Sequence, residues 1–217
     1  MPLSIWNGME DCLQAIVRTR PRSVLDVGIG FGLWGHLLRQ YLDVWSGRIY
    51  PEQWTTRIDG IEIDPRRIQA HARLLYSQIH VGDMRALVPT VAATTSYDVI
   101  LFGDVIEHLE KPDALAVLDS AVSLAGRIVV LRIPIGDGWR REGREEPDHH
   151  RSQWTPADFD RYCASVRIYE FMGNPYALVV IDVLGTRLAA IDERLQRIEA
   201  HLLGLSKLGL SKGDKSC

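Results

Sequence analysis

The chain has 217 residues, of which 46% are hydrophobic and 24% are charged, and its net charge is -3. This size and composition are typical of one globular domain with a short extension, and the slight acidity gives no general attraction to nucleic acid or to an anionic membrane. No apolar run is long enough to span a bilayer and we see no signal peptide, so we expect a cytoplasmic protein. The three cysteines are far apart in the sequence, which argues against a disulfide framework.

The first two predicted elements are a helix and a buried strand. Apolar residues recur at helical spacing over residues 2–20, with Ser4 as a candidate cap and Pro21 directly after the end. Residues 23–27 form a short apolar run rich in β-branched side chains, which predicts a buried parallel strand.

A glycine-rich loop follows this strand. Gly28, Gly30 and Gly32 allow a tight turn and a close approach of the backbone to a ligand, and the apolar period becomes helical over residues 33–42. A strand, a glycine loop and a helix in this order form the nucleotide-binding corner of a doubly wound α/β sheet. Asp26 lies inside the strand, two residues before the first glycine, and this position suits a ligand with a cationic amine better than the pyrophosphate of a dinucleotide.

The connection over residues 43–56 is longer than usual between a helix and a strand and contains Trp45, Tyr50 and Trp54. Two interpretations stay open for it. It is either a surface excursion that packs its own aromatic side chains, or a functional segment, namely a lip over an acceptor site or a dimer contact.

The second strand is predicted over residues 57–63, with Glu62 near its carboxyl end, where a carboxylate can accept both ribose hydroxyls of a nucleoside. A helix with proline in its first turn should follow over residues 64–75, and then a third strand over 77–81. The remaining predicted elements are strands over 97–102, 126–133, 166–171 and 176–184 and helices over 112–124 and from Thr155 to about 163. Turn residues join the last two strands, which indicates an antiparallel hairpin.

The run Val24-Leu25-Asp26-Val27-Gly28-Ile29-Gly30-Phe31-Gly32 resembles the first motif of class I methyltransferases that depend on S-adenosylmethionine (SAM). The resemblance covers about residues 20–184. It implies an α/β fold, a doubly wound seven-stranded sheet that ends in an antiparallel hairpin, with SAM as the cofactor. It also implies an adenine contact from Asp83 with Met84 beside the ring. The cofactor-binding residues that we assign are Asp26, Gly28, Gly30, Gly32, Glu62, Asp83, Met84 and Asp104.

Asp104, Glu107 and His108 come directly after the fourth strand, where an open α/β sheet presents its ligand crevice. On a helical turn these side chains share one face, and two carboxylates with an imidazole suit a divalent ion such as Mg²⁺ or Mn²⁺. An acid-x-x-Glu-His sequence at this place resembles the metal site of two methyltransferase groups, one acting on phenolic or catechol hydroxyls in quinone biosynthesis and one on the terminal ribose 2'-hydroxyl of small RNAs. Here the first acid is Asp rather than Glu, which shortens its reach.

In the RNA group a further His, located after the fifth strand, completes the metal site. His149 and His150 lie in the corresponding region, and which of them would coordinate stays open. We assign His149 as the fourth ligand, beside Asp104, Glu107 and His108. Related enzymes use no metal, so His108, His149 or His150 acting as a general base is the alternative.

These features together predict an O-methyltransferase that acts on a small-molecule or oligosaccharide acceptor, with a sugar hydroxyl favoured. Trp139 and Trp154 flank the two histidines, and apolar sugar faces stack on such rings, although packing within the loop explains them equally well. The alternatives are a metal-independent enzyme for a phenolic or other hydroxyl, and a ribose 2'-hydroxyl RNA methyltransferase, which the acidic chain disfavours. Asp26 argues against an NAD-dependent dehydrogenase, and the Asp104-Glu107-His108 set argues against a non-catalytic SAM-binding or assembly module.

Beyond the predicted domain of residues 1–184, a helix is expected over 185–207 and a disordered tail over 208–217. Apolar residues in this region follow alternating steps of four and three, as in a coiled coil. They are Leu184, Leu188, Ile191, Leu195, Ile198, Leu202 and Leu205. The helix either lies on its own domain or pairs in a homodimer, and the narrow apolar stripe favours the homodimer.

Overall fold

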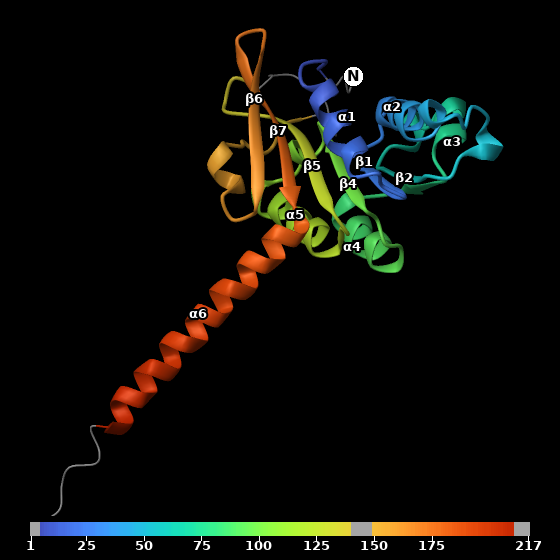
Figure 1. The fold of residues 1–217 in the computed structure, drawn as a ribbon. Coiled ribbons are helices and arrows are strands. Elements are labelled where there is room, and N and C mark those ends of the chain that lie inside the picture. The colour runs from blue at the N-terminus through green and yellow to red at the C-terminus, as the bar shows by residue number, and fades with distance from the viewer. Residues whose placement is uncertain (1–4, 140–148, 211–217) are drawn as a thin grey trace, which may run out of the picture.

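A computed structural model describes residues 5–139 and 149–210, and the sheet within them confirms the predicted fold class. Seven strands have the order β3-β2-β1-β4-β5-β7-β6 (Figure 1). β1 to β5 are parallel, whereas β7 is antiparallel to both β5 and β6. Their bounds are β1 Ser23–Val27, β2 Arg57–Glu62, β3 Gln78–Val81, β4 Val99–Gly103, β5 Ile128–Pro134, β6 Ala164–Phe171 and β7 Asn174–Asp182.

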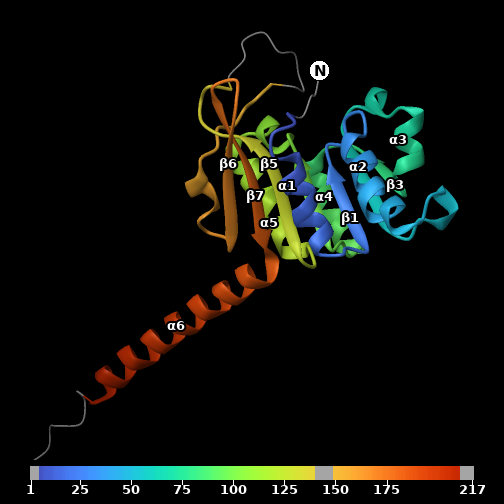
Figure 2. The same cartoon turned by 45° about the horizontal axis from the view of Figure 1, so that its top comes forward.

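Helices cover both faces of the sheet (Figures 1 and 2). One face carries α1 Met9–Arg18, α2 Leu33–Leu42 and α3 Ala70–Leu75, and the other carries α4 Met84–Thr94 and α5 Lys111–Leu124. Successive residues of β1 pack into different cores, because side chains alternate across a strand. Val24 joins the core of the α1–α3 face and Leu25 joins that of the α4–α5 face.

The first helix is shorter than predicted. α1 begins at Met9, after Gly8 with φ +75°, rather than near residue 2. The backbone before it is held differently, since the buried guanidinium of Arg132 donates to the carbonyl oxygens of Ile5 (2.6 Å) and Asn7 (2.8 Å). The predicted cap Ser4 lies outside the described residues.

Three other helical segments differ from the sequence prediction. Residues 64–75 form a 3₁₀ turn, Pro65–Arg67, and then α3, because Ile68 leaves the helical conformation (ψ 87°) and buries its side chain. The helix expected after Thr155 is only the 3₁₀ turn Pro156–Phe159. α4 was not predicted at all.

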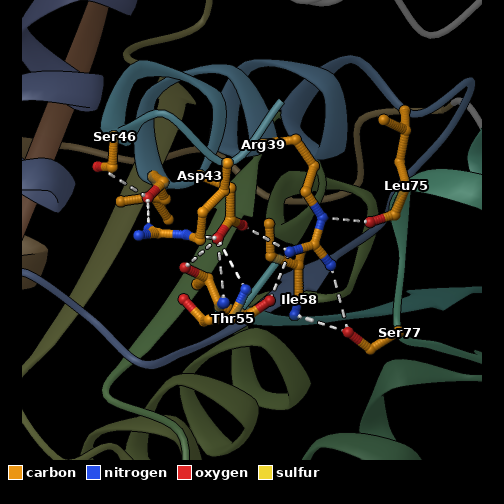
Figure 3. A network of polar contacts seen from close by, with 10 residues as sticks. Arg39, Asp43, Ser46, Thr55, Ile58, Leu75 and Ser77 are labelled. Carbon is orange, nitrogen blue, oxygen red and sulfur yellow. Dashed lines mark hydrogen bonds and ion pairs between the residues drawn. The ribbon is translucent and has the colours of Figure 1, made fainter. Parts of the chain in front are cut away.

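A buried polar network holds residues 43–56 in place (Figure 3). Arg39 donates to the carbonyl oxygens of Leu75 (2.8 Å) and Thr56 (2.5 Å) and to Asp43 (2.8 Å). Asp43 also accepts from Arg48 (2.9 Å). Burial alone would raise the pKa of Asp43, but the hydrogen bonds from backbone amides, Arg48 and Arg39 hold it below its ordinary value.

The segment 43–56 lies at the edge of the sheet where the parallel strands begin, since it leads directly into the start of β2. A lip over an acceptor site would instead lie at the carboxyl ends of the strands, so the structure does not support that interpretation. The prediction that the segment packs its aromatic side chains holds for Trp54, which lies against Arg39, and in part for Trp45, which is 77% exposed but stacks on Tyr41 of α2. Tyr50 is exposed.

The last helix, α6 Val183–Leu210, begins at the end of β7 and projects away from the body of the molecule (Figures 1 and 2). The alternative of a helix lying on its own domain is therefore wrong. Its N-terminal end is at the edge of the sheet where β5 begins, because Asp182 of β7 pairs with Ile128. Residues 211–217 lie outside the described part of the chain. Among the described helices, none combines the length and apolar character that crossing a membrane requires.

Candidate active site

The glycine loop turns the chain sharply at the carboxyl end of β1. Gly28 has φ +79°, and its N–H donates to the carbonyl oxygen of Ile61 at 2.8 Å, which ties the loop to β2. A Cβ atom on Gly28 would lie 2.3 Å from the side chain of Val105, so both its conformation and its surroundings require glycine. Gly32, with φ +87°, immediately precedes α2.

Glu62 fixes the shape of the neighbouring turn. Its carboxylate is only 2% exposed and accepts the N–H of Gly30 at 2.8 Å and the N–H of Asp64 at 3.0 Å, each on a different oxygen. Each carboxylate oxygen has two lone pairs and so keeps capacity for a further donor. Glu62 therefore both shapes the glycine loop and presents acceptors at the carboxyl edge of the sheet.

Asp26 has a different environment from the one that its position in the motif suggested. It is fully buried, and its Oδ2 accepts the hydroxyl of Tyr76 at 2.5 Å; the same hydroxyl accepts the N–H of Gly35 at 3.0 Å. Burial raises the pKa of Asp26 to about 7, and the negative charge of Glu62 reinforces this, while the Tyr76 hydrogen bond opposes it. Asp26 and Tyr76 thus fix the first turn of α2, which follows the glycine loop.

Asp83 and Met84 begin α4 beside this loop. Asp83 caps the helix by accepting the N–H of Arg85 at 2.8 Å, and it also binds the Arg85 guanidinium at 2.6 Å. These bonds hold the pKa of Asp83 below its ordinary value. Met84 is the first residue of the helix, so its side chain lies at the mouth of the same crevice.

Asp104 does not share a helical face with Glu107 and His108. It has φ +58°, and its N–H continues the sheet ladder by donating to the carbonyl oxygen of Arg132 at 3.0 Å. Its carboxylate accepts the hydroxyl of Tyr176 and lies 3.8 Å from the Arg132 guanidinium. Burial and the negative charge of Asp104 raise the pKa of Tyr176 well above its usual value, so the phenol stays protonated and donates.

The 3₁₀ turn Ile106–His108 brings together a carboxylate and two imidazoles. Ligand atoms of Glu107, His108 and His150 all lie within 4.8 Å of one another, and the two imidazole rings meet edge to face with centroids 5.1 Å apart. Glu107 is 1% exposed, whereas the histidines are half-buried. His149 contributes its carbonyl oxygen to His108 Nδ1 (3.1 Å), and its imidazole is outside the group found among the described residues.

One pocket at the carboxyl edge of the sheet contacts most of the predicted site residues. The predicted residues that line it are Gly28, Gly30, Glu62, Asp83, Met84, Asp104 and His108. Asp26 and Gly32 are outside its lining. Val105, Leu109, Arg67 and Arg151 also line it and were not predicted. Val105 and Leu109 were the easiest of these to foresee, because each directly follows a predicted site residue, Asp104 or His108, in the sequence.

A row of aromatic rings extends from Asp104 toward the surface. Trp139 lies edge-on to Tyr176 (5.9 Å between centroids) and stacks on Phe171 (6.3 Å). Trp6 also contacts Phe171, edge-on with ring centroids 5.2 Å apart, and its side chain is 73% exposed. Trp154 is different: it is fully buried and stacked on another aromatic ring at 5.5 Å, so it belongs to the core.

Comparison with known proteins identifies the fold. No protein-family model matches the sequence, and no curated protein matches it either. Among solved structures, an O-methyltransferase family protein from Burkholderia thailandensis is similar with a TM-score of 0.53 and 12% identity over 79% of this chain and 54% of that one, so the chain spans about half its length.

Two further solved structures are similar over most of their own length. The methyltransferase domain of bacterial CtHen1 has a TM-score of 0.51 and 19% identity, covering 81% of this chain and 100% of that domain. The 1,6-didemethyltoxoflavin-N1-methyltransferase of Burkholderia thailandensis, solved with bound 1,6-didemethyltoxoflavin and S-adenosylhomocysteine, has a TM-score of 0.59 and 12% identity, covering 81% and 78%. At these identities the likeness shows the fold, which is that of class I methyltransferases.

Proposed function

We propose that this protein is a SAM-dependent methyltransferase that transfers a methyl group to a hydroxyl. One observation carries the proposal: His108 lies on the wall of the pocket at the glycine loop and also belongs to the group with Glu107 and His150. A cofactor site and an acid–imidazole group thus adjoin at the carboxyl edge of the sheet, where open α/β sheets bind ligands. SAM supplies an already activated methyl group, so the residues need only place the acceptor oxygen and remove its proton.

The pocket residues fit the parts of SAM. Glu62 offers carboxylate oxygens to the ribose hydroxyls, and the left-handed turn at Gly28 allows the backbone to approach the ligand. Asp83 and Met84 line the same pocket as Glu62, and we assign them to the adenine. The bound S-adenosylhomocysteine in the N1-methyltransferase of similar fold supports the same cofactor here.

Glu107, His108 and His150 fit a divalent ion, because one carboxylate oxygen and two imidazole nitrogens approach closely enough to share it. Of the two ions considered, Mn²⁺ is the better match, because Mg²⁺ prefers oxygen ligands and two of these three donors are imidazole nitrogens. Such an ion, when bound, lowers the pKa of an acceptor hydroxyl and orients it. Asp104 lies three residues earlier but is bound to Tyr176, so we assign it the task of positioning this edge of the sheet.

The acceptor that we favour is a sugar or oligosaccharide hydroxyl. Trp139 is half-buried and linked through Tyr176 to Asp104, which lines the pocket, and its ring is one on which the apolar face of a sugar can stack. If no metal binds, His108 or His150 takes the proton as a general base. A ribose 2'-hydroxyl of RNA is the second candidate, because the acid-x-x-Glu-His sequence resembles the metal site of the RNA-modifying methyltransferase group, but the chain's net charge of -3 disfavours it.

Calorimetric titration with SAM and with NAD tests the cofactor. We expect SAM but not NAD to bind, and Glu62→Gln to weaken SAM binding about tenfold, the usual cost of losing hydrogen bonds to a charged acceptor. Glu52→Gln is the matched control, since it makes the same chemical change at an exposed residue far from the pocket lining. Unchanged SAM affinity in Glu62→Gln, or tight NAD binding, would overturn the assignment.

Electron paramagnetic resonance of bound Mn²⁺ tests the metal separately from catalysis. His150→Ala should weaken Mn²⁺ binding at least about tenfold because it removes a ligand. His149→Ala should leave Mn²⁺ binding within about twofold, since only the His149 carbonyl contacts the group. If His149→Ala weakened Mn²⁺ binding and His150→Ala did not, His149 would be the ligand. If the wild type bound no Mn²⁺, the general-base alternative would be favoured.

A further inference from the structure

The exposed apolar stripe of α6 is the largest feature of the chain that the proposed reaction does not use. Every residue from 187 to 199 is exposed, and the helix extends away from the body (Figure 2). Its apolar side chains are exposed by about half or more: Leu184 63%, Leu188 56%, Ile191 55%, Leu195 53% and Ile198 48%. A solvated helix of this kind gains little stability alone, so the stripe indicates a surface that packs against another chain.

The spacing assigns a heptad register to this stripe. Leu188 and Leu195 take the a positions, and Leu184, Ile191 and Ile198 take the d positions. The sequence continues the pattern into Leu202 and Leu205, whose side chains lie outside the described ones.

The flanking positions of the register carry opposite charges. The g positions hold Arg187 and Arg194, and the e positions hold Asp192 and Glu199. In a parallel coiled coil the g residue of one helix faces the e residue of the next heptad on its neighbour, which brings Arg194 to Glu199 of a second copy. In an antiparallel coiled coil, g faces g and e faces e, which would place like charges together.

We propose that α6 joins copies of this chain in a parallel coiled coil. Charge complementarity identifies the partner as a second copy, because one helix supplies both the basic and the acidic flank. Arg187 donates to the carbonyl oxygens of Ser123 (2.7 Å) and Ala125 (2.9 Å), which secures the base of the helix to the domain. The interchain ion pair that we count is therefore Arg194 with Glu199.

This arrangement leaves the active-site pocket accessible. The pocket lies at the carboxyl ends of the parallel strands, whereas α6 begins beside the start of β5, at the opposite edge of the sheet. A parallel coiled coil places the copies around its N-terminal end with their pockets directed away from it. The inference does not depend on the proposed reaction, and its tests measure mass rather than activity.

Sedimentation equilibrium on the full chain at about ten micromolar tests the interface. We expect the wild type to have a mass above that of its 24.5 kDa monomer. The Leu195→Lys variant should be monomeric, because a charge in the apolar stripe should weaken association about a hundredfold. The matched control is Gln196→Lys, which introduces the same side chain at the next residue, outside the apolar stripe. This variant should assemble as the wild type does. A monomeric wild type, or an assembled Leu195→Lys variant, would overturn the proposal; circular dichroism confirms that each variant is folded.

Charge reversal tests the orientation. In a parallel assembly Arg194→Glu should weaken association about fivefold, because it faces Glu199, and adding Glu199→Arg should restore it. In an antiparallel assembly Arg194→Glu would remove a repulsion between g positions. Stronger association of Arg194→Glu than of the wild type would therefore overturn the parallel arrangement.

Discussion

Replacing Asp26 by Asn should change how the stability of the fold depends on pH. The carboxyl is fully buried in β1, and burial raises its pKa from 3.8 to about 7. The folded protein therefore keeps a proton on Asp26 that the unfolded chain releases above about pH 4, so this group makes the fold less stable as pH rises from about 4 to about 7. Asn has the shape of the protonated acid, retains an acceptor for Tyr76, and does not ionise.

The size of the effect follows from the shift in pKa. Linkage gives the Asp26→Asn variant an advantage over the wild type of about 2 kcal/mol at pH 5 and about 4 kcal/mol at pH 8. Urea unfolding followed by circular dichroism at both pH values measures this difference, and other titrating groups cancel in the comparison.

Asp59→Asn is the matched control for this substitution. Asp59 is also fully buried, on the neighbouring strand β2, but it pairs with Arg57 at 2.8 Å. Asp59→Asn removes the charge-assisted hydrogen bond from the half-exposed Arg57, so it should lose stability at both pH values. An Asp26→Asn variant that is less stable than the wild type at pH 8, or whose gain does not change between pH 5 and pH 8, would refute the reasoning.

Three further predictions concern other parts of the chain. Asp43→Asn should cost about 3 kcal/mol in urea unfolding at pH 7, because Arg39 would lose its buried partner. This deficit should shrink as pH falls below about 4, because the unfolded wild type then takes up a proton on Asp43 that the folded protein, in which the pKa of Asp43 is lowered, still excludes. Tyr176→Phe removes the hydrogen bond that holds the Asp104 carboxylate, so kcat for methyl transfer should fall about tenfold. SAM affinity measured by calorimetry should stay within about twofold of the wild type. A fall in SAM affinity instead would mean that Tyr176 shapes the cofactor pocket. Leucine at the a positions, with isoleucine at two of the d positions, Ile191 and Ile198, favours three or four helices over two. Sedimentation should therefore give that many copies, and a dimer would show that the flanking charges set the number.

The sequence predicted the centre of the sheet well because the signals there are local. The bounds of β1 were predicted to the residue, since Pro21 and Gly28 limit a short apolar run on both sides. α2 was predicted equally well, because the apolar period becomes helical directly after Gly32. α4 was missed, since Pro89 lies in its interior and β-branched residues weaken its helical pattern.

The candidate site could be predicted only in part, because several of its contacts join distant segments. The acid-x-x-Glu-His sequence located Glu107 and His108, but the partner of Asp104 is Tyr176, 72 residues away on the antiparallel strand β7. Whether Tyr176 reaches Asp104 depends on the pairing register of the hairpin, and the turn residues alone do not determine that register. The choice of His150 over His149 likewise depends on which imidazole faces the turn, which two adjacent histidines in a sequence cannot reveal.

Transfer of a labelled methyl group from SAM to a panel of sugars and oligosaccharides tests the central claim most directly. Each reaction is run with Mn²⁺, with EDTA, and with EDTA followed by excess Mn²⁺. Both the wild type and Glu107→Gln are used, because this substitution removes ligand charge with little change of shape. We expect a labelled sugar hydroxyl with Mn²⁺, loss of transfer in EDTA, recovery with added Mn²⁺, and a rate lowered at least about a hundredfold in Glu107→Gln. Full transfer in EDTA would contradict the metal, and no transfer to any hydroxyl by a protein that binds SAM would contradict the proposed reaction.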